Sequence, residues 1–317
     1  FAGFRHPKAP VMTLPHLPVR PSPPRFQVVV AFAAIYLIWG STYLAIRVAV
    51  ETFPPFLLGA IRFLVAGGGL YLLLKLRGTA GPTRRQWIHG SLAGCIMLIG
   101  GNGLVNWAEQ LVPSNLAALV IASTPVWFVV FDWIRPGGQR PSWEIWTGVL
   151  LGLAGVGYLV LGGNSPVGVP GFDPRGTGLL LVATICWAGG STLARHTDRP
   201  ESPWMVASVH MMAAGGAMLG ISWAMGEGAG MALDSISLRS WVSLAYLIVF
   251  GSWVAFSAYV WLLEVSSPAK VATYAYVNPV VAVVLGWLLL GETVSARMGA
   301  AALVILTAVI VLTWPRR

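Results

Sequence analysis

The chain has 317 residues, of which 56% are hydrophobic and only 10% are charged, and it carries 15 tryptophans. This composition excludes an ordinary soluble domain and predicts an all-α integral membrane protein. The formal net charge of +9 would suit nucleic acid binding, but the basic residues lie in short segments between apolar stretches. A bias of positive charge to one side of a bilayer explains them better. We therefore expect the lipid bilayer and a small-molecule substrate as partners, and no nucleic acid.

Apolar stretches follow one another at the length of about 20 residues that crosses a hydrocarbon core of ~30 Å. Residues 1–25 precede them and are basic and proline-rich, which predicts a disordered cytoplasmic tail rather than a signal peptide, with Met12 as a candidate start. The ten predicted transmembrane helices cover residues 26–46, 55–75, 87–107, 114–134, 143–162, 176–194, 204–225, 240–263, 270–290 and 298–314.

The distribution of lysine and arginine predicts the orientation of these helices. Fifteen of these residues lie on the side that would hold the N-terminus, four lie on the opposite side, and only Arg62 is left, well inside a predicted span. Short loops rich in lysine and arginine stay in the cytoplasm. We therefore expect a multi-pass protein of a bacterial-type inner membrane with both termini in the cytoplasm.

The second half of the sequence repeats the first half. Matching residues are separated by 148 positions near the start of each half and by 154 positions further on. With five predicted spans in each half, the two copies would have opposite orientations, as in alternating-access transporters. This predicts a first repeat over residues 26–163 and a second over 164–317. The matched pairs are Trp39 and Trp187, Arg47 and Arg195, Pro55 and Pro203, Gly67 and Gly215, Trp107 and Trp261, and Pro125 and Pro279.

One stretch carries a family resemblance most clearly. The sequence from Ile38 to Gly68, IWGSTYLAIRVAVETFPPFLLGAIRFLVAGG, resembles the EamA domain of the drug/metabolite transporter superfamily, and Cys186 to Gly216 is a more diverged second copy. Thr124-Pro125, Asn278-Pro279 and Gly291-Glu292 also fit that family's pattern. The resemblance implies two inverted five-helix EamA-like repeats around a central cavity. It also implies export of small metabolites, as in the YddG-like exporters of aromatic amino acids.

Arg62 and His210 are repeat mates that both fall inside predicted spans. A charged side chain at the centre of a transmembrane helix costs roughly 2.5–3.5 kcal/mol on insertion scales, so it normally faces a cavity or a partner. Arg62 would then attract a substrate carboxylate, while His210 would donate a hydrogen bond or titrate. The alternatives are that Arg62 snorkels to the interface and that His210 bonds a neighbouring carbonyl.

Amide side chains mark two further candidate faces. Asn102 and Asn106 are four residues apart, so they share one helical face, and Trp107 is adjacent. These residues either contact substrate or join helices. In the ninth predicted span Lys270, Tyr274 and Asn278 form a stripe at intervals of four residues.

Prolines follow polar residues in two matching spans. Pro279 directly follows an asparagine and should break its helix, and its repeat mate Pro125 follows a threonine. Matching breaks of this kind indicate either hinge and gating elements or fixed bends.

Aromatic residues and one serine supply the remaining candidate lining of the cavity. A tryptophan deep in a bilayer carries a polar N–H, which favours a place inside the bundle. These further substrate-binding candidates are Trp39, Tyr43, Trp187, Trp253 and Ser257.

Several kinds of chemistry have no support in the sequence. There is no nucleophile elbow, metal-ligand cluster or nucleotide-binding loop, so we expect neither an enzyme nor a cofactor. Aspartate and glutamate are absent from the middle of the predicted spans, which leaves His210 as the candidate proton site or else transport down the substrate gradient.

The expected function is therefore that of a secondary transporter. We expect export of small amphipathic metabolites, above all aromatic or hydrophobic amino acids, with a multidrug exporter of cationic amphiphiles as the alternative. Gly148 and Gly152 form a pair that favours close helix packing within a monomer or, less directly, a weak dimer.

Overall fold

The computed structural model describes residues 23–135, 138, 140–161, 173–229, 233–266 and 271–313. The expected tail up to residue 22, Lys270 and most of the link between the two expected repeats lie outside these residues. Apart from turns, the described chain is helical. Its elements are α1 (Arg25–Ala49), α2 (Pro55–Leu76), α3 (Arg84–Gly94), a π-helix (Cys95–Gly103), α4 (Leu104–Ala108), α5 (Ser114–Ile121), α6 (Thr124–Ile134), α7 (Trp143–Leu161), α8 (Pro174–His196), α9 (Pro203–Ala224), a 3₁₀ turn (Leu233–Ser235), α10 (Leu238–Tyr246), a second π-helix (Leu247–Phe256), α11 (Ser257–Val265), α13 (Tyr274–Leu290) and α14 (Ala296–Thr313).

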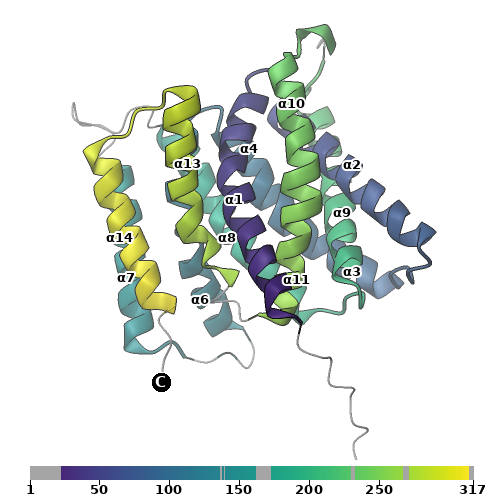
Figure 1. Ribbon diagram of the computed structural model, residues 1–317, viewed down its shortest axis with the longest axis horizontal. Coiled ribbons are helices and arrows are strands. Elements are labelled where there is room, and N and C mark those ends of the chain that lie inside the picture. Colours follow the sequence, from purple (N-terminus) through teal and green to yellow (C-terminus); the bar gives the residue numbers. More distant parts are fainter. Residues whose placement is uncertain are drawn as a thin grey trace, which may run out of the picture.

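In the part of the chain that the structure describes, helices lie in every range that the sequence predicts as a span. Within the described residues, seven helical stretches are long and apolar enough to cross a membrane. Three of these stretches are composite, because a π-helix or a break divides them into shorter elements. The three remaining predicted ranges contain α7, α13 and α14. Helices α7 and α14 pair with each other at one edge of the bundle (Figure 1).

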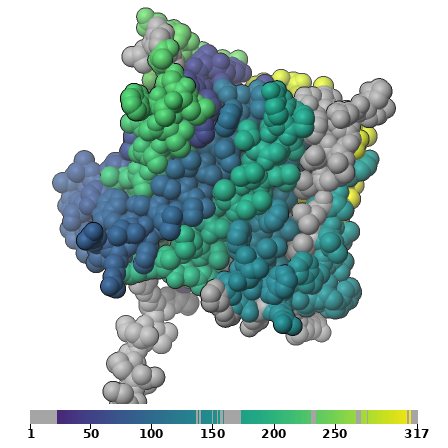
Figure 2. All heavy atoms as spheres, turned by 180° about the vertical axis from the view of Figure 1, so that it is seen from behind, coloured from purple at the N-terminus to yellow at the C-terminus, as the bar shows by residue number. Residues whose placement is uncertain are grey.

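Helix α1 lies at the centre of the bundle and packs against α5, α10, α11 and α13 (Figure 1). We call the end where α1 begins and α14 finishes the proximal end, and the end that holds Val50 to Pro54 the distal end. Seen from behind, the blue surface of α3 and α4 lies directly beside the teal surface of α8 (Figure 2). The sequence predicts that the proximal end faces the cytoplasm.

Two glutamates hold helix N-termini at the distal end. The carboxylate of Glu292 accepts hydrogen bonds from the backbone N–H groups of Ser114 and Asn115, at 2.9 and 3.1 Å, where α5 begins. Glu227 accepts from the backbone N–H of Leu57 at 2.9 Å in the first turn of α2. The first N–H groups of a helix have no partner within it, and the helix dipole favours a negative charge there. Each carboxylate therefore fixes a loop of one half of the chain against a helix of the other half.

The pairing of α2 with α9 is the most extensive helix contact in the described bundle, and it depends on glycine. A Cβ atom built on Gly215 would lie 2.8 Å from the backbone nitrogen of Leu64, and one built on Gly67 would lie 2.8 Å from that of Met212. These two glycines are repeat mates, and each lies directly against the backbone of the other helix. Backbone cannot move aside as a flexible side chain can, so both positions need glycine.

We therefore predict that Gly215→Ala destabilises the protein by about 1–3 kcal/mol, the usual penalty for overpacking. The neighbouring Gly216 offers a matched control, because a Cβ built there meets nothing within 4 Å. Gly216→Ala should leave stability unchanged or raise it slightly, since alanine favours helix over glycine. Thermal unfolding in detergent micelles, followed by circular dichroism, measures both. Equal midpoints for the two variants would contradict the account of this crossing.

Candidate functional site

A cavity lies inside the bundle beside α1. Its walls come from α1, α2, both π-helices, α4, the junction of α5 and α6, α8 and α13. Seven of the predicted binding residues line it, together with residues that the sequence did not single out. The predicted residues are Trp39, Tyr43, Arg62, Asn102, Trp187, Tyr274 and Asn278.

The Arg62 side chain lies inside the protein. It is 4% exposed, which excludes the alternative that it snorkels to the interface in this conformation. Its Nε donates to Ser252 Oγ at 2.9 Å and its Nη1 donates to Asn102 Oδ1 at 3.3 Å. Gly251 leaves room for the guanidinium, because a Cβ there would lie 2.9 Å from Nη2. Of the ion pairs found among the described residues, none includes Arg62.

Three aromatic rings, those of Trp39, Trp187 and Tyr274, form one wall of the cavity, and the ring of Tyr259 packs against all three, edge to face or tilted. The Trp39 ring centroid lies 5.4 Å from that of Trp187, 5.0 Å from that of Tyr259 and 5.1 Å from that of Tyr274. The Trp39 indole Nε1 donates to the carbonyl of Gly251 at 3.3 Å. Such geometry stabilises aromatic pairs beyond their area of contact, so this wall is rigid and apolar beside a polar end.

Both π-helices line the cavity. The first contributes Leu98, Gly101 and Asn102, and the second contributes Gly251 and Phe256. A π-helical segment widens the backbone and exposes groups that an α-helix would hide, and such segments occur often at functional sites. Hydrophobic periodicity does not distinguish a π-helix from an α-helix, so the sequence could not place them.

Other predicted residues lie away from this cavity. Asn106 is buried and donates to the carbonyl of Pro55 at 3.1 Å, so it joins α4 to α2. Trp107 is 37% exposed and packs against Phe56. Trp253 is 40% exposed, and its Nε1 donates to the carbonyl of Ala66 at 2.8 Å.

Ser257 is fully buried, and its hydroxyl has no hydrogen-bond partner among the residues that the structure describes. The amide nitrogen of Asn278 donates hydrogen bonds to the backbone carbonyls of Tyr36 at 3.1 Å and Tyr274 at 3.0 Å. Asn278 therefore ties α13 to α1 while it lines the cavity.

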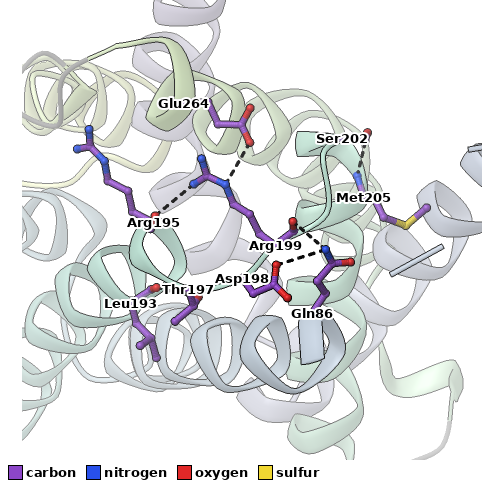
Figure 3. Close-up of polar contacts among 9 residues, drawn as sticks. All are labelled: Gln86, Leu193, Arg195, Thr197, Asp198, Arg199, Ser202, Met205 and Glu264. Atoms are coloured by element: carbon purple, nitrogen blue, oxygen red, sulfur yellow. Dashed lines mark hydrogen bonds and ion pairs between the residues drawn. The ribbon is translucent and has the colours of Figure 1, made fainter. Parts of the chain in front are cut away.

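His210 borders a second, smaller pocket at the proximal end with Arg195, Arg199 and Glu264. The guanidinium of Arg199 pairs with the Glu264 carboxylate at 3.8 Å, and its Nη1 lies 3.5 Å from the carbonyl of Arg195 (Figure 3). Gln86 joins this group from α3 by donating to the carbonyl of Arg199 at 3.0 Å. The repeat mates Arg62 and His210 thus lie in separate pockets.

The two prolines have different surroundings. Pro125 lies in the first turn of α6, directly after the break at Ala122 and Ser123, where the fourth stretch passes the cavity. Pro279 lies inside α13, and the break in the ninth stretch comes earlier, at Ala272 and Thr273. Both stretches are thus interrupted next to residues that line the cavity.

A carboxyl group that the sequence did not predict to be buried lies directly after α4. Glu109, which follows α4, has no exposed surface, and neither carboxyl oxygen has a hydrogen-bond partner in the described chain. Its backbone carbonyl accepts a hydrogen bond from Arg47 Nη1. The sequence places Glu109 at the end of a predicted span, and residues at span ends are usually exposed, so nothing in the pattern indicated its burial.

Several known proteins have similar sequences, and two of the three described here are named as transporters. The uncharacterized inner membrane transporter YedA of Escherichia coli K12 is 41% identical over 284 residues, which cover 89% of each chain. The uncharacterized transporter YvbV of Bacillus subtilis is 25% identical over 90% of this chain and 91% of its own. The chloroplastic WAT1-related protein At3g02690 of Arabidopsis thaliana is 25% identical over 88% of this chain and 68% of its own.

The fold of this chain is also similar to that of a protein of known structure. A solved crystal structure with 22% sequence identity aligns with a TM-score of 0.65 and covers 92% of this chain and 97% of its own. The sequence profile of the EamA-like transporter family matches residues 27–161 and again residues 174–314. Its relatives are transporters rather than enzymes. The chain is therefore a member of the EamA-like transporter family.

Proposed function

We propose that the protein exports a small amphipathic amino acid with an aromatic or large apolar side chain by alternating access around the central cavity. In this proposal all ten helical stretches cross an inner membrane as two inverted five-helix repeats, divided between residues 163 and 164. Both termini face the cytoplasm, and the chain works as a monomer or weak dimer. The family and the relative whose name includes "inner membrane transporter" support the general assignment.

The observation that carries the choice of substrate is the isolated charge of Arg62. A guanidinium removed from water is stabilised strongly by a carboxylate. The described residues supply a hydroxyl, an amide oxygen and the ring of Phe63, whose centroid lies 4.8 Å from the guanidinium carbon, but no carboxylate. A substrate carboxylate would complete this coordination through charge-assisted hydrogen bonds. Glycine at position 251 lets the guanidinium pack at this position in the cavity.

The aromatic wall suits the remainder of such a substrate. The rings of Trp39, Trp187 and Tyr274 form one surface of the cavity that Arg62 also lines, and Tyr259 packs against them. An apolar or aromatic side chain would gain contact area on this surface while its carboxylate reaches Arg62. The hydroxyl of Thr42 and the amide of Asn102 border the same cavity and suit an amino group.

The alternative, export of cationic amphiphiles, suits the cavity less well. A cation would have to approach the Arg62 guanidinium in a region of low dielectric, where like charges repel strongly. The aromatic faces could attract a cation, but the described lining of the cavity contains no carboxylate to oppose Arg62. This electrostatic argument does not apply to neutral drugs, so the liposome uptake test described below includes a neutral drug.

Alternating access needs elements that can move between two arrangements. The fourth and ninth stretches are both interrupted next to the cavity, with Pro125 and Pro279 close to the interruptions. The third and eighth stretches carry the π-helices. We propose that these four stretches change shape while α7 and α14, which pair at the edge of the bundle, stay fixed.

The direct test is uptake by purified protein in liposomes with labelled aromatic and aliphatic amino acids. Arg62→Gln keeps a hydrogen-bonding side chain but removes the charge. It should lower uptake of an aromatic amino acid about 10- to 100-fold, the loss expected for a charge-assisted hydrogen bond of ~1.5–3 kcal/mol. Exchange of the uncharged carboxamide analogue should change much less.

Arg175→Gln serves as the matched control, because Arg175 is exposed at the start of α8 and pairs with Asp173 at 2.8 Å. It should transport as the wild type does. An equal loss for acid and carboxamide in Arg62→Gln would contradict the assigned role of Arg62. Transport of a neutral or cationic drug, without any amino acid, would favour the drug-exporter alternative.

Stability gives an independent prediction. If Arg62 serves substrate rather than structure, replacing it with a residue of similar length and no charge should not unfold the protein. Arg62→Met removes an unpaired buried charge and two hydrogen bonds, and we expect the melting temperature to stay constant or rise while transport is lost. Thermal unfolding in detergent measures this. A marked fall in melting temperature would show that Arg62 is structural.

A further inference from the structure

Glu109 occupies the distal end of the bundle, one residue beyond the apolar stretch Arg84–Ala108. It is 0% exposed, and both of its carboxyl oxygens lack a hydrogen-bond donor among the described residues. By contrast, Glu292 and Glu227 at the same end accept backbone N–H groups of helix N-termini. Glu109 is thus the carboxyl group at this end whose burial no helix terminus explains.

Charged and titratable groups surround Glu109 from several elements. Arg47 on α1 donates to its backbone carbonyl, which leaves the carboxyl oxygens without this donor. Glu292 and Arg47 are both close enough to act on it electrostatically. From α8, which packs against α4, Arg175 directs its guanidinium to Asp173 instead.

The physical consequence is that Glu109 binds a proton readily in this arrangement. Burial and the negative charge of Glu292 raise the pKa of the Glu109 carboxyl well above its usual range, and Arg47 opposes them only in part. An ionised carboxylate without donors would be strongly unfavourable at this position. The neutral form needs no counter-charge.

Glu109 is also linked to the cavity through α1. Tyr43 lies one helical turn before Arg47 on α1, lines the cavity and is within electrostatic range of Glu109. The same turn of α1 therefore faces the cavity through Tyr43 and Glu109 through Arg47. A movement of α1 on substrate binding would therefore change the surroundings of Glu109.

We propose that Glu109 is the proton-binding carboxyl of this carrier and that it couples proton movement at the distal end to turnover of the cavity. The inference rests on the proposed function, because coupling requires a carried solute. In the present arrangement the carboxyl holds one proton. When Arg47 turns from the Glu109 carbonyl to the carboxyl oxygens, the O–H bond breaks, the proton passes to water and an ion pair with Arg47 replaces it.

Coupling is tested with purified full-length protein in liposomes. Exchange of labelled for unlabelled aromatic amino acid is compared with net uptake driven by a pH gradient, of which one unit supplies about a tenfold driving ratio per coupled proton. Glu109→Gln mimics the protonated carboxyl, so it should retain exchange and lose the response to the gradient. Glu51→Gln, an exposed acid at the same end, should behave as wild type.

Two further variants test other titratable groups that could bind the coupled proton instead of Glu109. Glu292→Gln removes the neighbouring charge but leaves Glu109 in place, so the gradient response should persist. His210→Gln tests the titratable group of the proximal pocket, and it too should keep the response. A normal gradient response in Glu109→Gln, or its loss in His210→Gln alone, would overturn the proposal. So would a response to a sodium gradient in place of a pH gradient.

A readout without substrate keeps this inference distinct from the proposed function. Infrared spectroscopy of the wild type at neutral pH should show the C=O band of a protonated carboxylic acid, and Glu109→Gln should lack it. If no amino acid is carried but the band is present and depends on Glu109, the substrate assignment fails while the proton site remains. Absence of the band from the wild type would overturn the assignment of Glu109.

Discussion

The burial of the Arg62 guanidinium among aromatic rings is the constraint to which the rest of the site conforms. A membrane-embedded arginine without a carboxylate is unfavourable on its own, so its surroundings must hold it in place. Ser252 and Asn102 accept its hydrogen bonds from the two π-helices, and glycine at 251 leaves the space it needs. Burying the Arg62 guanidinium is energetically unfavourable, and its hydrogen-bonding capacity is only partly used. Such a group fits a role in binding an anionic substrate group.

The architecture explains how such a site is held and how it could move. Glycines at positions 67 and 215 bring α2 against α9 at backbone contact, which fixes one side of the cavity. Other walls include the two π-helices and the two interrupted stretches, where backbone hydrogen bonding is already irregular. Rigid packing on one side and irregular backbone on the other are what a carrier with two arrangements requires.

The sequence predicted the helices well because an apolar span and its bounding prolines are local signals. Seven predicted residues line the cavity, and three of them follow from a related argument: a polar residue within a span is expected to face inward, and Arg62, Asn102 and Asn278 do so. The sequence could not separate a cavity from a helix contact, so Asn106, which joins α4 to α2, was grouped with Asn102. Whether a polar group faces a cavity depends on neighbours distant in sequence.

The remaining site residues gave no local signal. The two π-helices are indistinguishable from α-helix by periodicity, and Gly251 and Ser252 matter only because Arg62 reaches them across the bundle. Glu109 lies at the end of an apolar stretch, where a charged residue ordinarily meets water. Its burial results from packing among α1, α8 and the residues beyond α13.

The central claim is that the cavity recognises a carboxylate through Arg62 and an apolar group through its aromatic wall. Equilibrium binding of a labelled aromatic amino acid to the purified wild-type protein, in competition with the unlabelled acid and with its carboxamide, tests this most directly. The account predicts that the acid competes at least about tenfold more strongly than the carboxamide, as expected for a buried charge-assisted contact. Equal competition by the two compounds would contradict it.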